Sequence, residues 1–332
     1  MNTFIIAEAG VNHNGDITLA KRLVDEASKA GVDAVKFQTW RTELLVSKDA
    51  CQAKYQAENT GIVESQFDML KRLELSYSEF LELKSYCDSL GVMFMSTPDE
   101  VESANFLLPL QEIFKIGSGE LTNIPFLRHI ARFKKKIILS TGMGNLDEIN
   151  SALHSLESDV IVRSDITLLH ATTMYPTPMS DVNLKAIKTL RDTFNTSVGY
   201  SDHTMGIEVS VAAVALGASV IEKHFTLSRD MHGPDHMSSL EPDELKAMVS
   251  AIRNIEEALG DGVKMAKPSE EKNKTVVRKS IVAIQPINKG DLYTKKNLGT
   301  KRTFDGLPAS MWMRVLGLQA NNDYKIDETI RL

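Results

Sequence analysis

Short apolar runs alternate with amphipathic stretches along most of the chain. Segments such as Leu19–Ala30, Tyr77–Leu90, Leu146–Leu156 and Ile207–Leu216 repeat apolar residues at the spacing of one helix face. The apolar runs between them predict eight strands, at Phe4–Ala7, Ala34–Phe37, Val92–Met95, Ile113–Ile116, Ile137–Leu139, Ile166–Leu169, Ser197–Tyr200 and Ser219–Ile221. Eight strand and helix units indicate an α/β fold, a closed (β/α)8 TIM barrel. The alternative is an open doubly wound sheet.

Polar residues follow nearly every predicted strand, and this favours the barrel. Active sites of such barrels are built from the carboxyl ends of the strands. The residues at these positions are Glu8, Lys36, Gln38, Thr97, Ser118, Glu120, Ser140, Tyr175, Ser201 to His203, and His224.

The last helical pattern, Asp243–Leu259, ends at a Gly-Asp-Gly sequence. We therefore expect the barrel to span residues 1–262. Residues 263–274 are polar, contain proline and lack apolar periodicity, so they predict a linker. Residues 275–332 contain β-like runs at Ser280–Ile284 and Thr329–Arg331 and predict a small β-rich domain.

Composition and charge narrow the possible partners. The formal net charge is -6 and the sequence pI is about 5.8, which argues against nucleic acid, because phosphate backbones are bound by clustered Lys and Arg. The amino terminus has no basic region and only a short apolar run, so we expect no signal peptide, no membrane span and a cytoplasmic protein. Cys51 and Cys87 are interpreted as reduced and structural.

Lys36 and Lys115 each stand near the end of a run that is otherwise apolar. Two ammonium groups that meet at one barrel mouth repel each other, so a phosphate or carboxylate ligand would join them. The turns Gly117–Gly119 and Ser140–Gly142 would add the backbone and hydroxyl donors that cradle phosphates. The alternative is that each lysine caps its strand or pairs with a nearby carboxylate.

Two histidines, His203 and His224, end consecutive predicted strands. Neighbouring barrel strands lie ~5 Å apart, so both imidazoles can reach one ion, with Glu222 and Asp235 close by. No third His or Cys is near in the sequence, which favours an open Mn²⁺ or Mg²⁺ site over a closed zinc site. The alternative is two ordinary polar residues.

A carboxylate, Glu8, ends the first predicted strand and precedes the polar turn Asn12–Gly15. At the barrel mouth it is well placed to handle protons. It could instead pair with a lysine, and the Asn14–Gly15 pair could be only a turn.

Nine short sequences together resemble the sialic acid synthases, which include N-acetylneuraminate and N,N'-diacetyllegionaminate synthases. The tail resembles the antifreeze-like (SAF) domain of that family. The matching sequences occur in family order, at Ile6–Gly15, Val35–Thr39, Ser96–Pro98, Lys115–Glu120, Ile138–Met143, Tyr175–Pro178, Ser201–Thr204, Glu222–Thr226 and Gly233–Asp235.

The resemblance implies condensation of phosphoenolpyruvate with an N-acetylated mannosamine-type aldehyde and water, giving a nine-carbon 2-keto sugar acid and phosphate. It implies a divalent ion on His203 and His224, and a homodimer in which Arg302 of each SAF domain reaches the partner's barrel. Phosphoenolpyruvate would contact Lys36, Gln38, Thr97, Lys115, Ser118, Ser140, Tyr175 and Ser201; the sugar would contact Glu8, Glu120, Asp235 and Arg302; and the catalytic set would be Glu8, Lys36, Lys115, Glu120 and Glu222.

The chain departs from the family pattern at two places. The family usually has Lys-Arg-Pro-Gly where this chain has Lys301–Phe304, and many members have Asn or Asp at the position of Thr173. Two other functions stay open. One is a phosphoenolpyruvate-condensing synthase for a phosphorylated aldose, although the mouth motifs lack the arginines of a second phosphate site. The other is a non-catalytic sugar-binding protein.

Overall fold

The computed structural model describes residues 2–53, 56–57, 60–157 and 161–332. It divides into two compact units, Met1–Gly260 and Asp261–Leu332. The division lies two residues before the boundary expected at Gly262.

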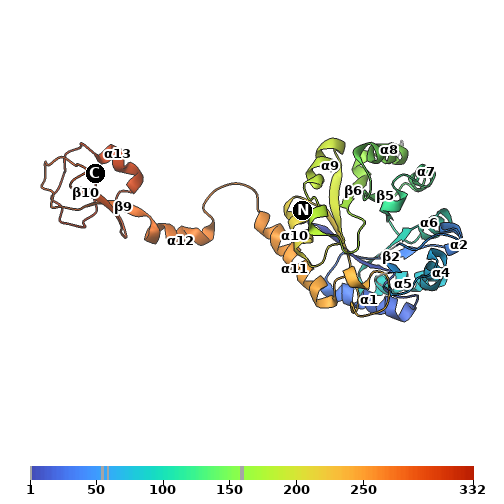
Figure 1. Ribbon diagram of the computed structural model, residues 1–332. Coiled ribbons are helices and arrows are strands. Elements are labelled where there is room, and N and C mark those ends of the chain that lie inside the picture. The colour runs from blue at the N-terminus through green and yellow to red at the C-terminus, as the bar shows by residue number, and fades with distance from the viewer. Residues whose placement is uncertain (1, 54–55, 58–59, 158–160) are drawn as a thin grey trace. The chain divides into compact units, whose positions relative to one another are not determined.

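Unit 1 is built on eight parallel strands. Their order in the sheet is β3, β2, β1, β8, β7, β6, β5, β4, and the two end strands of this order lie side by side, so the sheet closes into a TIM-type barrel (Figure 1). The open sheet considered above is therefore wrong. The strands are β1 (Phe4–Gly10), β2 (Ala34–Thr39), β3 (Met93–Pro98), β4 (Ile113–Ile116), β5 (Lys136–Ser140), β6 (Ile166–Ala171), β7 (Ser197–Asp202) and β8 (Val220–His224).

Helices surround the strands and begin and end at good capping residues (Figure 1). Helix α5 starts with a capping box formed by Ser76 and Glu79 and ends at Gly91 in the left-handed conformation, where glycine costs no strain. The helices of unit 1 are α1 (Ile17–Ala30), α2 (Thr42–Leu45), α4 (Gln66–Leu73), α5 (Tyr77–Leu90), α6 (Val101–Leu107), α7 (Ile124–Ala131), α8 (Leu146–Leu156), α9 (Ala186–Phe194), α10 (Glu208–Ala215) and α11 (Pro242–Leu259).

Two apolar layers hold the barrel together. The larger lies between the strands and the outer helices. A smaller cluster, which we call the plug, contains strand residues that pack together inside the sheet: Ile6, Ala34, Met95, Ile138, Leu169 and Val220, with Ile113 packed against them. The plug makes the barrel interior a packed core and leaves only the mouth for chemistry.

The barrel has a seam between β3 and β4. No register pairs these two strands in the part of the chain that the structure describes, although they are neighbours. The buried Gln111 side chain takes the place of a backbone partner: its Oε1 accepts from Ser96 N at 2.7 Å and its Nε2 donates to Ser96 O at 3.0 Å. The Gln111 amide thus gives hydrogen-bond partners to the backbone N–H and C=O of Ser96, which no described strand pairs on that side.

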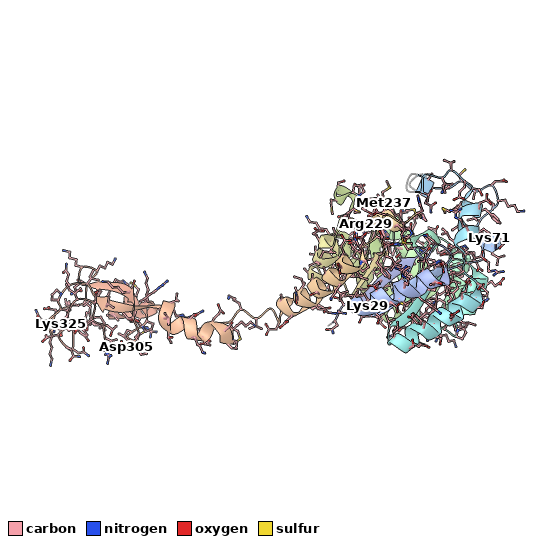
Figure 2. The ribbon with its side chains drawn as sticks, turned by 90° about the horizontal axis from the view of Figure 1, so that it is seen from below. Lys29, Lys71, Arg229, Met237, Asp305 and Lys325 are labelled. Atoms are coloured by element: carbon pink, nitrogen blue, oxygen red, sulfur yellow. The ribbon has the colours of Figure 1, made fainter. Side chains whose placement is uncertain are left out.

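Unit 2 has its own small core, which includes Ile281, Tyr293 and Val315. It contains α12 (Pro268–Val277), an antiparallel pair of β9 (Lys279–Ala283) and β10 (Leu298–Arg302), and the short helix α13 (Trp312–Val315). Asp305 and Lys325 mark its surface in Figure 2. Whether this unit is the antifreeze-like domain stays a prediction.

The tail shows two details that the sequence did not predict. Part of the expected linker, residues 263–274, is helical: α12 begins at Pro268, a residue suited to the first helical turn, and Glu270 accepts a hydrogen bond from Lys267 N. The run at residues 329–331 lies along β9, through a bridge from Thr329 to Val282 and a hydrogen bond from Ile330 N to Ile281 O, but the named partner strand of β9 is β10.

Two further expectations concern the cysteines and a membrane span. Both cysteines are free thiols; Cys51 is exposed and Cys87 is buried on α5. Among the helices in the described ranges, none combines the length and apolar character needed to cross a bilayer. The cytoplasmic location stays a prediction.

The seam predicts a specific stability loss. Gln111→Met should lower the free energy of unfolding by about 1–3 kcal/mol, because it leaves the buried N–H and C=O of Ser96 without partners. Urea denaturation measures this change. The control is Gln66→Met on α4, which should change stability by less than about 0.5 kcal/mol. Equal losses in the two variants would contradict a closing role for Gln111.

Candidate active site

A polar layer lies directly above the plug. Each of its members comes two positions after a residue of the plug or, for Lys115, after Ile113, and side chains two apart on a strand face the same side. All six are buried. The layer consists of Glu8, Lys36, Thr97, Lys115, Ser140 and Glu222.

The two lysines of this layer share one carboxylate. Glu222 Oε2 lies 3.6 Å from Lys36 Nζ, and Glu222 Oε1 lies 3.4 Å from Lys115 Nζ. Lys36 Nζ is also 2.6 Å from Glu8 Oε2 and donates to Thr97 Oγ1 at 3.0 Å. The sequence had left open a ligand anion or a neighbouring carboxylate between the lysines, and in this structure the carboxylates occupy that role. We call these four charged side chains the ion cluster.

In the ion cluster, neighbouring charges and burial shift the pKa values in opposite directions. Burial acts to raise the pKa of Glu222, but Lys115 and Lys36 outweigh it and hold that pKa low, at about 2. Burial raises the pKa of Glu8 to about 7, against the opposing effect of Lys36. Burial lowers the pKa of Lys115. A cluster of two acids and two bases is thus close to neutral and can accept an anion without a net repulsion.

Hydroxyl groups border the ion cluster. Ser201 Oγ donates to Glu222 Oε1 at 2.8 Å, and Ser118 Oγ accepts from Gly142 N at 3.0 Å. A Cβ at position 142 would lie 2.7 Å from Ser118 Oγ and 2.8 Å from Thr173 Cγ2, so any larger residue than glycine would displace these side chains. The turns after β4 and β5 therefore approach closely and present their donors together.

Two histidines face each other beside the ion cluster. The ring centroids of His203 and His224 are 5.6 Å apart. His203 Nδ1 lies 2.7 Å from Thr172 O, so Nδ1 carries the proton and Nε2 keeps its lone pair. Burial lowers the pKa of both imidazoles, that of His203 to about 4. Two neutral buried imidazoles suit a divalent cation, and His224 Nδ1 is a buried atom that no hydrogen bond of the described residues satisfies.

The polar turn after β1 holds the loop after β8. Asn12 Nδ2 donates to Phe225 O and to Ser239 Oγ, at 2.8 and 2.9 Å. Ser239 Oγ donates in turn to Asp235 O at 2.6 Å, and Asp235 Oδ2 lies 4.0 Å from His224 Nδ1. The Asn12–Gly15 turn is thus more than a chain reversal, because it positions Asp235 near the histidines.

The other expected site residues lie at differing distances from the ion cluster. Gln38 Nε2 donates to Glu8 Oε1 at 3.1 Å, and the Tyr175 ring centroid is 4.1 Å from that of His203. Glu120 lies farther out, where its carboxylate accepts from Asn123 at 2.5 Å. Arg302 is exposed on β10 of unit 2, and its contact with the sugar stays a prediction.

Sequence reasoning missed Asp99, which directly follows β3. Burial and then the Glu120 charge raise its pKa to about 7, while Lys36 and Lys115 act in the opposite direction. The signal was present in the sequence, because Asp99 is a polar residue after a predicted strand, like the others that were selected.

Comparisons with known proteins show the family of this chain. Residues 23–264 match the NeuB family. N,N'-diacetyllegionaminic acid synthase of Campylobacter jejuni is 52% identical over 330 residues, which cover 99% of each chain. This chain belongs to the NeuB family. A Legionella pneumophila protein, also named N,N'-diacetyllegionaminic acid synthase, is 43% identical over 99% of this chain and 94% of its own length.

A solved relative supports the fold of this NeuB protein. The crystal structure of N-acetylneuraminic acid (sialic acid) synthetase from Leptospira borgpetersenii, in complex with citrate, superposes with a TM-score of 0.71. The two chains are 36% identical, and the match covers 82% of this chain and 90% of that one.

Behind the mouth of the NeuB barrel, a buried ion pair that is separate from the ion cluster joins β7 to β8. Asp202 and Lys223 alternate with the inward residues of their strands, point to the outer face, and meet at 3.0 Å with no solvent exposure. Asp202 also accepts from Thr204 N, Thr204 Oγ1 and Ser210 Oγ, and Lys223 Nζ donates to Thr204 O. This pair fixes the strand ends that carry His203 and His224.

Breaking this pair on one side should be costly. Lys223→Met should destabilise the protein by about 3–5 kcal/mol, because the Asp202 charge is left buried without its counterion. The double variant Asp202→Asn/Lys223→Met should lose less than the sum of the single losses, since both charges are removed. Urea denaturation of the two single variants and the double variant measures the coupling, and additive losses would contradict it.

Proposed function

We propose that this chain condenses phosphoenolpyruvate with an N-acetylated mannosamine-type aldehyde and water, and that its product is N,N'-diacetyllegionaminic acid. The observation that carries the proposal is the buried ion cluster, in which Lys36 and Lys115 share Glu222 above the plug. The names of the Campylobacter and Legionella relatives favour this product.

Phosphoenolpyruvate carries a phosphate and a carboxylate, and the mouth offers donors for both. Lys36 and Lys115 supply charge, and the other donors would be Gln38, Thr97, Ser118, Ser140, Tyr175 and Ser201. Charge-assisted hydrogen bonds of this kind are short and strong. The dense packing of these donors would orient the enol carbon toward the aldehyde, so that binding contributes to the rate.

The reaction forms one carbon–carbon bond and one carbon–oxygen bond from water, and it breaks the carbon–oxygen bond to phosphate. The C3 carbon of phosphoenolpyruvate attacks the aldehyde carbon, and water adds to the cationic C2. The C2–O bond to phosphate then breaks and leaves a ketone. One proton of the water ends on the new hydroxyl and the other leaves with the phosphate. Glu8 would hold the proton at the aldehyde oxygen, and Glu222 would keep both lysines in place.

A divalent ion, Mn²⁺ or Mg²⁺, would be held by His203 and His224 and would polarise the aldehyde. The support is the lone pair of His203 Nε2 and the unsatisfied Nδ1 of His224. No cluster of three His, Cys, Asp or Glu ligands occurs among the described residues, so water and substrate would complete the shell. Calorimetric titration with Mn²⁺ should show one site that is lost in His203→Ala/His224→Ala; unchanged binding would remove this assignment.

The acceptor assay tests the proposed function directly. Phosphate release should require phosphoenolpyruvate together with an amino sugar, and a 6-deoxy sugar with two acetamido groups should give the highest kcat/KM. A phosphorylated aldose should be a poor acceptor, because the acids Asp99 and Glu120 near the mouth repel a second phosphate. Turnover of a phosphorylated aldose alone would support the second enzyme considered above, and binding of sugars without phosphate release would support a non-catalytic protein.

Unit 2 would be the SAF domain and would complete the active site of a second copy. Phe304, in the loop after β10, is 98% exposed, and its neighbour Arg302 is also exposed. The loops that follow β5 to β8 present exposed methionines that an aromatic ring can contact. They are Met143, Met174, Met179, Met205 and Met237, the last of which is labelled with Arg229 in the loop after β8 (Figure 2).

Mixing two inactive variants tests the dimer. Lys115→Met should lower kcat/KM for phosphoenolpyruvate at least ~10-fold, from the loss of a charge-assisted contact, and Arg302→Ala should weaken sugar binding. Mixed dimers should regain activity, because one of their two sites has an intact barrel and an intact arginine. The control replaces Lys115→Met by a chain carrying both substitutions, which can form no complete site. No regain in proven mixed dimers would place Arg302 outside the partner's site.

A further inference from the structure

A cleft of about 750 Å³ opens on unit 1 where the barrel has its seam. Its lining comes from the segments that follow β3 and β4, with Asp99 and Val101 on one side and Glu120 on the other, and from Leu44 and Leu45 of α2. A volume of this size is typical of sites that hold a small organic molecule.

One end of the cleft lies beside the barrel mouth. Asp99 and Glu120 both line the cleft: Asp99 directly follows β3, which carries Thr97 of the polar layer, and Glu120 ends the turn after β4, which carries Lys115. Neutral sugars are bound by carboxylates that accept hydrogen bonds from hydroxyl and amide groups. Asp99 and Glu120 therefore place acceptors where the cleft adjoins the mouth, and Arg132, which follows α7, also lines the cleft.

The outer wall of the cleft combines apolar side chains with an amide. Leu44 is 56% exposed and Val101 is 44% exposed, so both offer uncovered apolar surface. Asn105 also lines the cleft, and its Oδ1 lies 2.8 Å from His129 Nε2. With Oδ1 engaged, the Nδ2 group of Asn105 can donate to a ligand. A ligand group with a methyl beside a carbonyl oxygen would fit this wall, because the methyl could contact Leu44 and Val101 and the oxygen could accept from Asn105.

We propose that the cleft binds the acetamido group of the acceptor sugar that lies farther from the aldehyde carbon. Asp99 and Glu120 accept from the N–H and from a neighbouring hydroxyl, Asn105 donates to the acyl oxygen, and Leu44 and Val101 cover the methyl. The inference rests on the proposed function and names the residues that select a sugar with two acetamido groups over N-acetylmannosamine.

The ratio of kcat/KM for the diacetamido sugar to that for N-acetylmannosamine tests the cleft. Leu44→Asn and Asn105→Asp should each lower this ratio at least ~5-fold, because the first removes the apolar wall and the second replaces a donor by an acceptor. The KM for phosphoenolpyruvate should change less than ~2-fold in both variants. Leu81→Asn on α5, where Leu81 is 51% exposed and lies outside the cleft lining, is the matched control and should leave the ratio unchanged.

The outcomes separate the two proposals. No phosphate release by the unaltered protein with any amino sugar would overturn the proposed function. An active protein in which both cleft variants keep the parent ratio, or lose both substrates equally, would overturn the cleft assignment and leave the function standing. Thermal melting of each variant, compared with Leu81→Asn, shows whether a loss arises from unfolding.

Discussion

The carboxylate of Glu222 lies between two buried ammonium groups, and the arrangement of the barrel mouth depends on this sharing. Lys36 and Lys115 come from β2 and β4, which lie on either side of β3 in the barrel wall. Their charges could not both remain in a dry interior without an anion between them. Glu222 supplies that anion before any substrate binds. The plug below and the strands around them hold both lysines in place.

Side chains on β7 and β8 alternate between two faces, one toward the mouth and one toward the outer side of the barrel. Ser201, His203, Glu222 and His224 face the mouth, while Asp202 and Lys223 face the opposite way and pair there. The outer pair is fully enclosed and hydrogen-bonded, so it resists movement of the strand ends. Rigid support behind the reacting groups is what a site needs if its geometry is to persist through a reaction.

Much of the barrel could be predicted because its strands are apolar where they are buried on both faces. All eight strands were predicted, but every one except β4 continues past its predicted end. In β1, β7 and β8 the polar residues Glu8, Asp202 and His224 interrupt the apolar pattern while the backbone still pairs. The bridging position of Glu222 could not be predicted, because it depends on how strands far apart in sequence are aligned. The role of Gln111 at the seam gave no signal, since a lone glutamine before a strand resembles any loop residue.

The seam also bears on how such a barrel can diverge. Elsewhere the wall is closed by backbone ladders, which every residue type except proline can form and whose register changes only with insertions or deletions. Between β3 and β4 the described hydrogen bonds come from one side chain, Gln111. A single substitution at Gln111 would therefore remove the hydrogen bonds between β3 and β4 without changing the register of the other strand pairs.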